Sequence, residues 1–318
     1  MKTIGFPTST KENEKRRVLL PPDVKRLSHP EYAYFETGYG DVLGYSDDDY
    51  IAVGAKICPR EETFVKDIVC DPKIGDANYL DLLPEGTIAF GWLHAVRNRP
   101  VADALIRNKL TAYAWEDMYD GGRHVFWRNN ELAGEAAVTH AFLCFGRMPY
   151  ETKVAVLGNG NTARGAIKVL NMFGAEVRQY GRSTEDLFRR ELGEYDVVVN
   201  CVLWDTARTD HIIYREDLRR MKRKAMIIDV SCDEAGAIET SVPTAIRKPV
   251  YETDGVLHYV VDHTPALYYK TFSQDNSETV APYIDMLIND APNSVLKNAL
   301  IIKDGEIIDE RIKEFQHR

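Results

Sequence analysis

Short apolar runs alternate with polar or amphipathic stretches along the chain. Runs bounded by glycine, proline or aspartate are typical of buried strands in a parallel sheet. In the first part of the chain we expect strands at residues 3–7, 32–36, 67–70, 87–93 and 111–115. Helix starts or a helical period predict helices at residues 23–27, 46–53 and 99–109. Strands that alternate with helices indicate an α/β domain.

The alternation continues after a long helical pattern at residues 129–145. Further strands are expected at residues 154–157, 175–180, 196–201, 226–230 and 258–261. Further helices are expected at residues 161–173, 187–192, 215–221 and from residue 279, before a hairpin-like pair at 300–308. The predicted fold class is α/β, with a Rossmann-type parallel-sheet nucleotide domain at residues 129–284. A second, discontinuous α/β domain, expected to hold the substrate, comprises residues 1–128 with 285–318.

A glycine motif follows the strand at residues 154–157. Gly158, Gly160 and Ala163 have the G-x-G-x-x-A spacing, and Asn161 opens the next helical pattern. In this spacing the first glycine permits a tight turn, the second lets the backbone approach a pyrophosphate, and the small third residue lets helix and strand pack closely. The free N–H groups at the helix start then bind phosphate. The motif predicts a dinucleotide site, and an ordinary glycine-rich turn is the alternative.

The end of the next strand indicates which dinucleotide is bound. NAD sites usually carry an acidic residue there, which bonds the ribose 2′-hydroxyl. Here the strand ends at Gly181, followed by Arg182 and Ser183, and the first carboxylate is Glu185. Arg182 and Ser183 can bind a 2′-phosphate, so NADP(H) is the predicted cofactor. The alternative is a solvated loop arginine, with NAD(H) as the cofactor.

Composition and charge exclude several classes of protein. The chain has 318 residues and a formal net charge of −9, which argues against nucleic acid or an anionic membrane as partner. No apolar run is long enough to span a membrane, and residues 1–17 lack the apolar core of a signal peptide. The five cysteines are scattered and form no C-x-x-C motif. We therefore expect reduced thiols, a cytoplasmic location and no metal site.

Several motifs, in order, resemble the alanine dehydrogenase, transhydrogenase and saccharopine dehydrogenase superfamily. They comprise residues 5–7, 14–21, 93–95 and 115–117, the glycine motif, residues 228–230 with Asp233, and residues 260–265. The length, the Gly181-Arg182-Ser183 strand end and the Asn159-Gly160-Asn161 turn are most similar to the N5-(carboxyethyl)ornithine synthase branch. That resemblance implies reductive joining of pyruvate to the side-chain amine of ornithine or lysine, giving an opine-type product. It also implies a homo-oligomer.

The resemblance assigns substrate and proton-transfer roles to two residues. Arg17 falls on the arginine that binds the substrate carboxylate, although Arg16 beside it leaves the assignment ambiguous by one position. A surface arginine in a basic run is the alternative. His94 falls on the catalytic histidine, and histidine titrates in the range suited to proton transfer. Without the resemblance, a histidine at a strand end is more often structural.

One position departs from the family pattern. Cys70 stands where alanine dehydrogenases have a substrate-binding lysine, and Lys73 is the nearest replacement. This counts against an ammonia-using alanine dehydrogenase and fits a pocket for a larger amine.

The resemblance also places residues near the nicotinamide. The resemblance implies that Asp233 takes part in catalysis and that Val230 packs on the ring. His263 and Thr264 replace a family Asn-Met pair beside the ring, so cofactor contact is expected. Candidates for the cationic end of the amine are Glu116, Asp117, Asp71 and Asp262.

Two other enzyme activities and one non-catalytic role stay open from the sequence. An NAD-dependent alanine dehydrogenase is disfavoured by Cys70 and Gly181. A saccharopine-type enzyme shares the Arg17 and His94 chemistry but needs a second cation for its longer diacid. A sensor that binds NADP(H) without turnover is the non-catalytic alternative.

Overall fold

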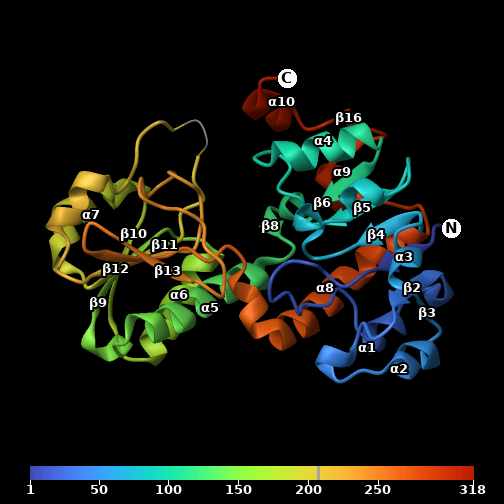
Figure 1. The fold of residues 1–318 in the computed structure, drawn as a ribbon, viewed down its shortest axis with the longest axis horizontal. Helices are drawn as coiled ribbons and strands as arrows, with labels where there is room; N and C mark the ends of the chain where they lie inside the picture. The colour runs from blue at the N-terminus through green and yellow to red at the C-terminus, as the bar shows by residue number, and fades with distance from the viewer. Residues whose placement is uncertain (206–207) are drawn as a thin grey trace. The chain divides into compact units, whose positions relative to one another are not determined.

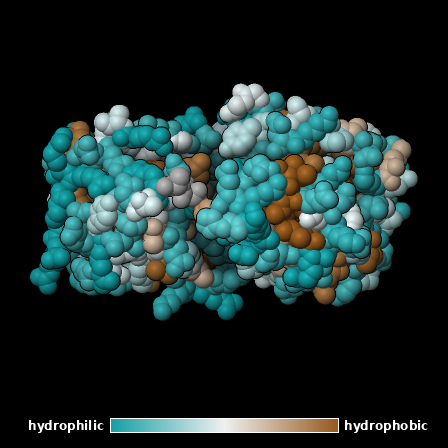
Figure 2. Space-filling model, turned by 90° about the horizontal axis from the view of Figure 1, so that it is seen from above, coloured by the Kyte–Doolittle hydropathy of each residue, from teal (hydrophilic) through white to brown (hydrophobic). Residues whose placement is uncertain are grey.

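A computed structural model describes residues 1–205 and 208–318, which form two compact units. Unit 1 comprises Met1–Phe126 and Tyr269–Arg318, and unit 2 comprises Trp127–Tyr268. Figure 1 labels their elements. Among the described residues, no helix is long and apolar enough to cross a membrane. The face in Figure 2 is mostly hydrophilic, with hydrophobic side chains in separate patches.

Unit 1 is built on an eight-stranded sheet with the order β16-β15-β6-β5-β4-β1-β2-β3. Strands β1 to β6 are parallel to their neighbours, and β15 joins β6 antiparallel. The strands are β1 Ile4–Phe6, β2 Ala33–Glu36, β3 Lys56–Cys58, β4 Ile68–Cys70, β5 Ile88–Gly91, β6 Thr111–Ala114, β15 Leu300–Lys303 and β16 Glu306–Ile307. A separate antiparallel pair joins β7 Tyr119–Asp120 to β8 Arg123–His124. The central strands are fully buried, as their apolar runs predict.

The helices of unit 1 cover this sheet. They are α1 Pro21–Val24, α2 Asp47–Ala52, α3 Arg60–Thr63, α4 Arg99–Arg107, α8 Tyr269–Ile288, α9 Ser294–Ala299 and α10 Glu310–Gln316. Helix α4 starts at the Asn98 side chain, which accepts a hydrogen bond from the Val101 N–H. Its buried Leu105 packs with Val69 of β4 and Ala89 of β5 in one core cluster.

Helix α8 differs from the sequence prediction. It begins at Tyr269 rather than near residue 279, and the expected domain boundary at 284/285 falls inside it. The buried face of its first turns includes Ser273 and Ser277, which accept hydrogen bonds from the Arg17 and Leu20 N–H groups, both at 2.8 Å. These bonds hold the whole helix in unit 1.

Unit 2 contains a six-stranded sheet with the order β10-β9-β11-β12-β14-β13. All neighbours are parallel except β13 and β14. The strands are β9 Lys153–Leu157, β10 Glu176–Tyr180, β11 Val197–Asn200, β12 Met226–Asp229, β13 Val250–Thr253 and β14 Val256–Tyr259. The helices are α5 Trp127–Phe145, α6 Asn161–Met172 and α7 Glu185–Glu191. The expected helix at 215–221 is a 3-10 helix, Arg215–Arg220.

Alternate residues of β9 face opposite sides of this sheet. Ala155 packs in the cluster that contains Phe188 of α7, whereas Val154 and Val156 pack in the cluster that contains Ala163 of α6. The strand order reverses at β9, with β10 on one side and β11 on the other. Ligands of open parallel sheets bind beyond the carboxyl ends of the strands at such a switch point. The predicted α/β fold class, with its Rossmann-type unit, is confirmed.

Close packing of two helices fixes the start of α6. A Cβ on Gly165 would lie 1.9 Å from the Glu131 carbonyl oxygen, and one on Gly134 would lie 2.0 Å from that of Thr162. Helices α5 and α6 therefore touch backbone to backbone, and only glycine fits at either position.

Candidate active site

Unit 1 gathers charged side chains at the carboxyl ends of neighbouring strands. Arg17 follows β1, Lys73 follows β4, His94 follows β5 and Glu116 follows β6, and these four strands are adjacent in the order β6-β5-β4-β1. Carboxyl ends of parallel strands meet at one sheet edge. His94 interacts electrostatically with both Lys73 and Glu116, so these three residues form one cluster.

The two neighbouring arginines have different environments. Both the Nε and Nη2 groups of Arg16 donate to the Glu14 carboxylate, at 2.8 and 2.6 Å, and both side chains are buried. Burial raises the pKa of Glu14, but the Arg16 charge and hydrogen bonds outweigh this and lower it below its ordinary value. Arg16 is thus committed to an internal ion pair.

The internal contacts of Arg17 use only part of its guanidinium, and the rest is available to another partner. Its Nε donates to the Tyr39 carbonyl oxygen and its Nη1 to the Arg16 carbonyl oxygen, while the guanidinium lies over the Tyr39 ring at 5.2 Å. These contacts fix the orientation of the group with neutral acceptors, so its positive charge is not paired within them. A planar cation held in this way suits a carboxylate ligand.

His94 sits in a strained turn that Glu116 holds. Its φ is +51°, which non-glycine residues rarely adopt. The Glu116 carboxylate accepts hydrogen bonds from the Leu93 and His94 N–H groups, at 3.2 and 2.5 Å, and lies 4.0 Å from the imidazole Nδ1. Local strain of this kind is common at functional sites.

Two opposing influences set the protonation of His94. Desolvation lowers its pKa below the ordinary value, although 55% of the side chain remains exposed and the effect is therefore partial. Glu116 and Asp76 raise the pKa, whereas Lys73 and Lys11 lower it. The net direction is downward, which favours the neutral imidazole at neutral pH.

Lys73 lies in an ion-pair network with two residues that we did not predict. The Lys73 and Lys11 ammonium groups each lie 3.1 Å from the same Asp76 oxygen. The Lys73 side chain is 9% exposed, so its ammonium group is held at a fixed place close to the imidazole of His94. Lys11 lies in a charge run that looks like a solvated surface, so its residue pattern did not indicate a functional role.

Cys70, the last residue of β4, and Asp71, which follows it, are both fully buried. Desolvation raises the pKa of the Cys70 thiol well above its ordinary value, so the side chain is a packed thiol. Burial raises the pKa of Asp71 to about 6, although hydrogen bonds from Tyr79 Oη, at 2.6 Å, and from the Lys73 N–H oppose this. Asp71 therefore holds the turn that carries Lys73 through its hydrogen bond with the Lys73 N–H group. Its carboxyl group is buried and is not a solvated surface acid.

The glycine turn of unit 2 has the geometry of a nucleotide cradle. Gly158 has φ +108°, and a Cβ there would meet the Cys201 carbonyl oxygen at 2.8 Å. A Cβ on Gly160, which precedes α6, would meet nothing within 4 Å, so the backbone is open on that side. Ala163 is fully buried against the sheet. The first N–H groups of α6, beginning at Asn161, can hold a pyrophosphate here.

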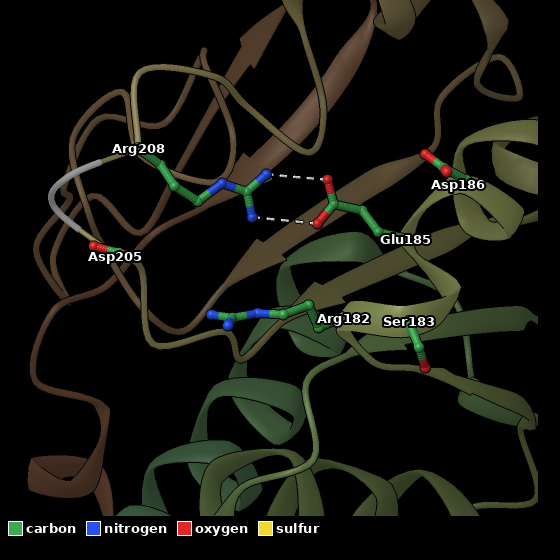
Figure 3. A pocket seen from close by; sticks show the side chains of 6 residues that line it. All are labelled: Arg182, Ser183, Glu185, Asp186, Asp205 and Arg208. Carbon is green, nitrogen blue, oxygen red and sulfur yellow. Dashed lines mark hydrogen bonds and ion pairs between the residues drawn. The ribbon is translucent and has the colours of Figure 1, made fainter.

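A pocket of about 410 Å³ lies beyond the end of β10 (Figure 3). It is lined by Arg182, Ser183, Glu185, Asp186, Asp205 and Arg208. Arg182 reaches toward the segment that carries Asp205 and Arg208, whereas the Ser183 hydroxyl points away from both arginines. Arg182 and Ser183 thus both line the pocket, but their side chains are not aimed at the same point. Arg208 was missed because it lies far from the glycine motif in sequence.

The loop after β12 carries Val230 and Asp233. Asp229 at the strand end accepts hydrogen bonds from Asn200 Nδ2, at 2.9 Å, and from the Ser231 and Cys232 N–H groups. Desolvation raises the pKa of this buried carboxyl group. Asp229 therefore fixes the loop, on which Val230 and Asp233 are both half-buried.

His263 and Thr264 are almost completely buried. His263 Nδ1 lies 2.6 Å from Asp262 Oδ1, and the Thr264 hydroxyl donates to the Ala133 carbonyl oxygen at 3.0 Å. The Thr264 contact ties its segment to α5, which is a packing role within unit 2. Of the acids expected to bind the amine, Asp117 is paired with Arg311 at 2.7 Å.

The Rossmann-type sheet with its glycine turn is typical of oxidoreductases that use a dinucleotide. The profiles described as "Alanine dehydrogenase/PNT, N-terminal domain" and "Alanine dehydrogenase/PNT, C-terminal domain" match residues 5–126 and 179–310. The chain is 30% identical to the N(5)-(carboxyethyl)ornithine synthase of Clostridium botulinum strain Hall, over 88% of this chain and 93% of that protein. The chain therefore belongs to the alanine dehydrogenase/PNT family and, within it, to the N(5)-(carboxyethyl)ornithine synthase group.

Other relatives agree with this assignment. The synthase of Lactococcus lactis strain IL1403 is 30% identical over 88% of this chain and 95% of its own length. The alanine dehydrogenase of Methanococcus maripaludis is 25% identical over 94% of this chain and 91% of its own length. A solved L-alanine dehydrogenase shares the fold with a TM-score of 0.83 at 23% identity, and each chain is covered to 99%.

Proposed function

We propose that the protein catalyses the NADPH-dependent reductive condensation of pyruvate with the side-chain amine of ornithine or lysine. The product is an N-(1-carboxyethyl) amino acid, an opine-type secondary amine. The observation that carries this choice is the 30% identity, over most of both chains, to proteins named N(5)-(carboxyethyl)ornithine synthase. Cys70, in place of the family lysine, supports it over ammonia as the amine.

Residues of unit 1 prepare the keto acid and the amine. The Arg17 guanidinium binds the pyruvate carboxylate, and the Lys73 ammonium adds positive charge beside it. The amine attacks the carbonyl carbon, and His94 transfers the protons that let the former carbonyl oxygen leave as water. The resulting carbon–nitrogen double bond is electrophilic, and the fixed charges hold it in one orientation.

Residues of unit 2 hold the cofactor. The turn at Gly158 and Gly160, with the start of α6 at Asn161, binds the pyrophosphate, and Arg182 binds the 2′-phosphate. When bound, the nicotinamide supplies the hydride that reduces the double bond. We assign Val230, His263 and Thr264 to the walls around the ring, and Asp233 to stabilising the positive charge that the nitrogen carries. We also include a homo-oligomer in the cytoplasm, which light scattering and fractionation would check.

The test is oxidation of the reduced cofactor with pyruvate and ornithine, lysine or ammonia, run with NADPH and with NADH. We expect turnover that needs ornithine or lysine and prefers NADPH, with the secondary amine identified by its mass. Activity with ammonia and NADH would indicate an alanine dehydrogenase, for which the relative at 25% identity is the supporting observation. Turnover only with 2-oxoglutarate and lysine would indicate a saccharopine-type enzyme, and cofactor binding without any turnover would indicate a sensor.

A variant connects this activity to the site. His94→Asn should lower kcat about 100-fold or more, because general acid–base catalysis contributes roughly that much, while NADPH binding is retained. His29→Asn, at a partly exposed histidine paired with Glu31, is the matched control and should leave kcat unchanged. Equal activity of both variants would remove His94 from the chemistry.

A further inference from the structure

The charges around the pocket beyond β10 do not by themselves favour a phosphate. Its lining contains two arginines but three carboxylates. A 2′-phosphate carries up to two negative charges, so it would be repelled unless at least one carboxylate is neutralised. The ion pairs inside the pocket therefore decide which nucleotide it accepts.

Glu185 is the carboxylate that matters most for this choice. It opens α7, directly after the loop that ends β10, and is the first acid beyond the strand end. In NAD-binding units an acid near that strand end accepts the ribose 2′-hydroxyl. An ionised and unpaired Glu185 would thus favour NAD(H) and repel NADP(H).

Glu185 is instead hydrogen-bonded to two arginines. Arg208 donates to both of its oxygens, at 3.2 and 3.3 Å (Figure 3), and Arg189 donates to one of them at 3.0 Å. Burial raises the pKa of Glu185, but these hydrogen bonds outweigh burial and lower it. Glu185 is therefore ionised, and its charge is compensated within the protein.

Arg208 is itself held in place. It donates to Asp210 at 2.6 and 2.8 Å, and its guanidinium lies over the Trp204 ring at 4.4 Å. Because Arg208 pairs with two carboxylates and stacks on an indole, its positive charge is already compensated and does not attract a phosphate. Arg182 differs, because its side chain makes no hydrogen bond or ion pair with any residue that the structure describes, and it is exposed.

We propose that Arg208 is a specificity-determining residue which neutralises Glu185 and thereby leaves Arg182 to bind the 2′-phosphate of NADPH. Arg208 acts through Glu185 and does not itself contact the phosphate. This inference rests on the proposed use of NADPH. It extends that proposal by explaining why a carboxylate near the strand end does not select NADH.

The test compares the affinities of the full-length protein for NADPH and for NADH, measured by nucleotide fluorescence without any turnover. Arg208→Met keeps an unbranched side chain at this position but removes two of the three arginine hydrogen bonds to Glu185, so that only the bond from Arg189 remains. We expect it to lower the NADPH affinity, relative to NADH, roughly tenfold, because like charges placed together are unfavourable. The loss should shrink at high salt, since the pocket is open to solvent.

Glu185→Gln should leave the NADPH affinity equal or higher, and the double variant Arg208→Met with Glu185→Gln should recover it to within about twofold. Arg190→Met removes the same charge from an exposed site on α7 and serves as the matched control. If Arg208→Met does not fold, Glu185→Gln decides alone, and a weaker affinity for NADPH in that variant overturns the inference.

The outcomes separate this inference from the proposal on which it rests. A wild-type protein that binds NADH more tightly overturns the proposed cofactor and this inference together. A wild-type protein that prefers NADPH, and keeps that preference in Arg208→Met, overturns the inference alone. An equal loss of both nucleotides, or a double variant without recovery, also overturns it.

Discussion

Glu116 offers a direct test of the electrostatics around His94. Its carboxylate lies 4.0 Å from the imidazole Nδ1 and raises the pKa of His94. The Leu93 and His94 N–H groups donate to different oxygens of Glu116, so Glu116→Gln removes the charge and keeps the acceptor for one of these two bonds. The pKa of His94 should therefore fall further, while the turn loses only one of its two hydrogen bonds to residue 116.

The size of the shift follows from the distance and the exposure. Two unit charges 4.0 Å apart interact by about 1 kcal/mol in bulk water and about 4 kcal/mol at the effective dielectric constant of a protein surface. Because 55% of the His94 side chain is exposed, the lower figure applies after screening. An interaction of this size is enough to move the titration of His94 measurably to lower pH.

The assay is an NMR titration of the His94 ring, with its resonance assigned from the His94→Asn variant. It requires no knowledge of the substrate. If the enzyme is active, the limb of the pH profile that reports His94 should also move to lower pH, whichever protonation state is active. Glu85→Gln, at an exposed carboxylate paired with Lys109, is the control and should shift nothing.

Glu116→Ala separates the charge from the hydrogen bonds. It removes the acceptor of two backbone N–H groups in a turn where His94 has φ +51°, so we expect a further loss of stability of about 1–3 kcal/mol. An unchanged or raised His94 pKa in Glu116→Gln would refute the electrostatic reasoning.

Three further predictions test other parts of the chain. Asp71 has a folded pKa of about 6 against an ordinary 3.8, so its protonated form stabilises the fold at low pH and that contribution is lost as pH rises. Urea unfolding should show the wild type losing about 3 kcal/mol relative to Asp71→Asn between roughly pH 4 and 6, and parallel curves would contradict this. Gly165→Ala should destabilise unit 2 by about 1–3 kcal/mol and weaken NADPH binding, despite a better helix propensity, because its Cβ would meet the Glu131 backbone. Arg17→Lys should raise the KM for pyruvate at least roughly tenfold with the NADPH affinity unchanged, since lysine cannot make a bidentate contact, and an unchanged KM would dismiss Arg17 as the carboxylate ligand.

Strand positions were largely predictable because buried parallel strands are continuous apolar runs. β9 and β4 lie within one residue of their expected bounds. β3 was not predicted, since Lys56 and Ile57 in this edge strand are not fully buried and the run is short. The start of α8 was missed for a different reason. Its buried face is polar there, and the hydrogen bonds that make this possible connect residues more than 250 positions apart.

Those parts of the candidate site that depend on a single residue type could be predicted from the sequence. The glycine turn depends on the absence of side chains, which a sequence displays directly. Lys11 and Asp76 were missed because a charged residue in a loop looks solvated until its partner is known. The choice between Arg16 and Arg17 could not be made from sequence either, since it depends on the ion pair of Arg16 with Glu14.

Both units contain one arginine that is paired with a carboxylate and a second arginine that is not. In unit 1, Arg16 is paired with Glu14, and the side-chain hydrogen bonds of Arg17 go to neutral carbonyl oxygens. In unit 2, Arg208 is paired with Glu185, and Arg182 projects into the pocket. An arginine whose charge is already compensated contributes structure, whereas its neighbour keeps the charge that an anionic group needs. Loss of the paired arginine should therefore harm anion binding by exposing a carboxylate, and removing that carboxylate as well should restore it, which loss of the ligand arginine itself would never allow.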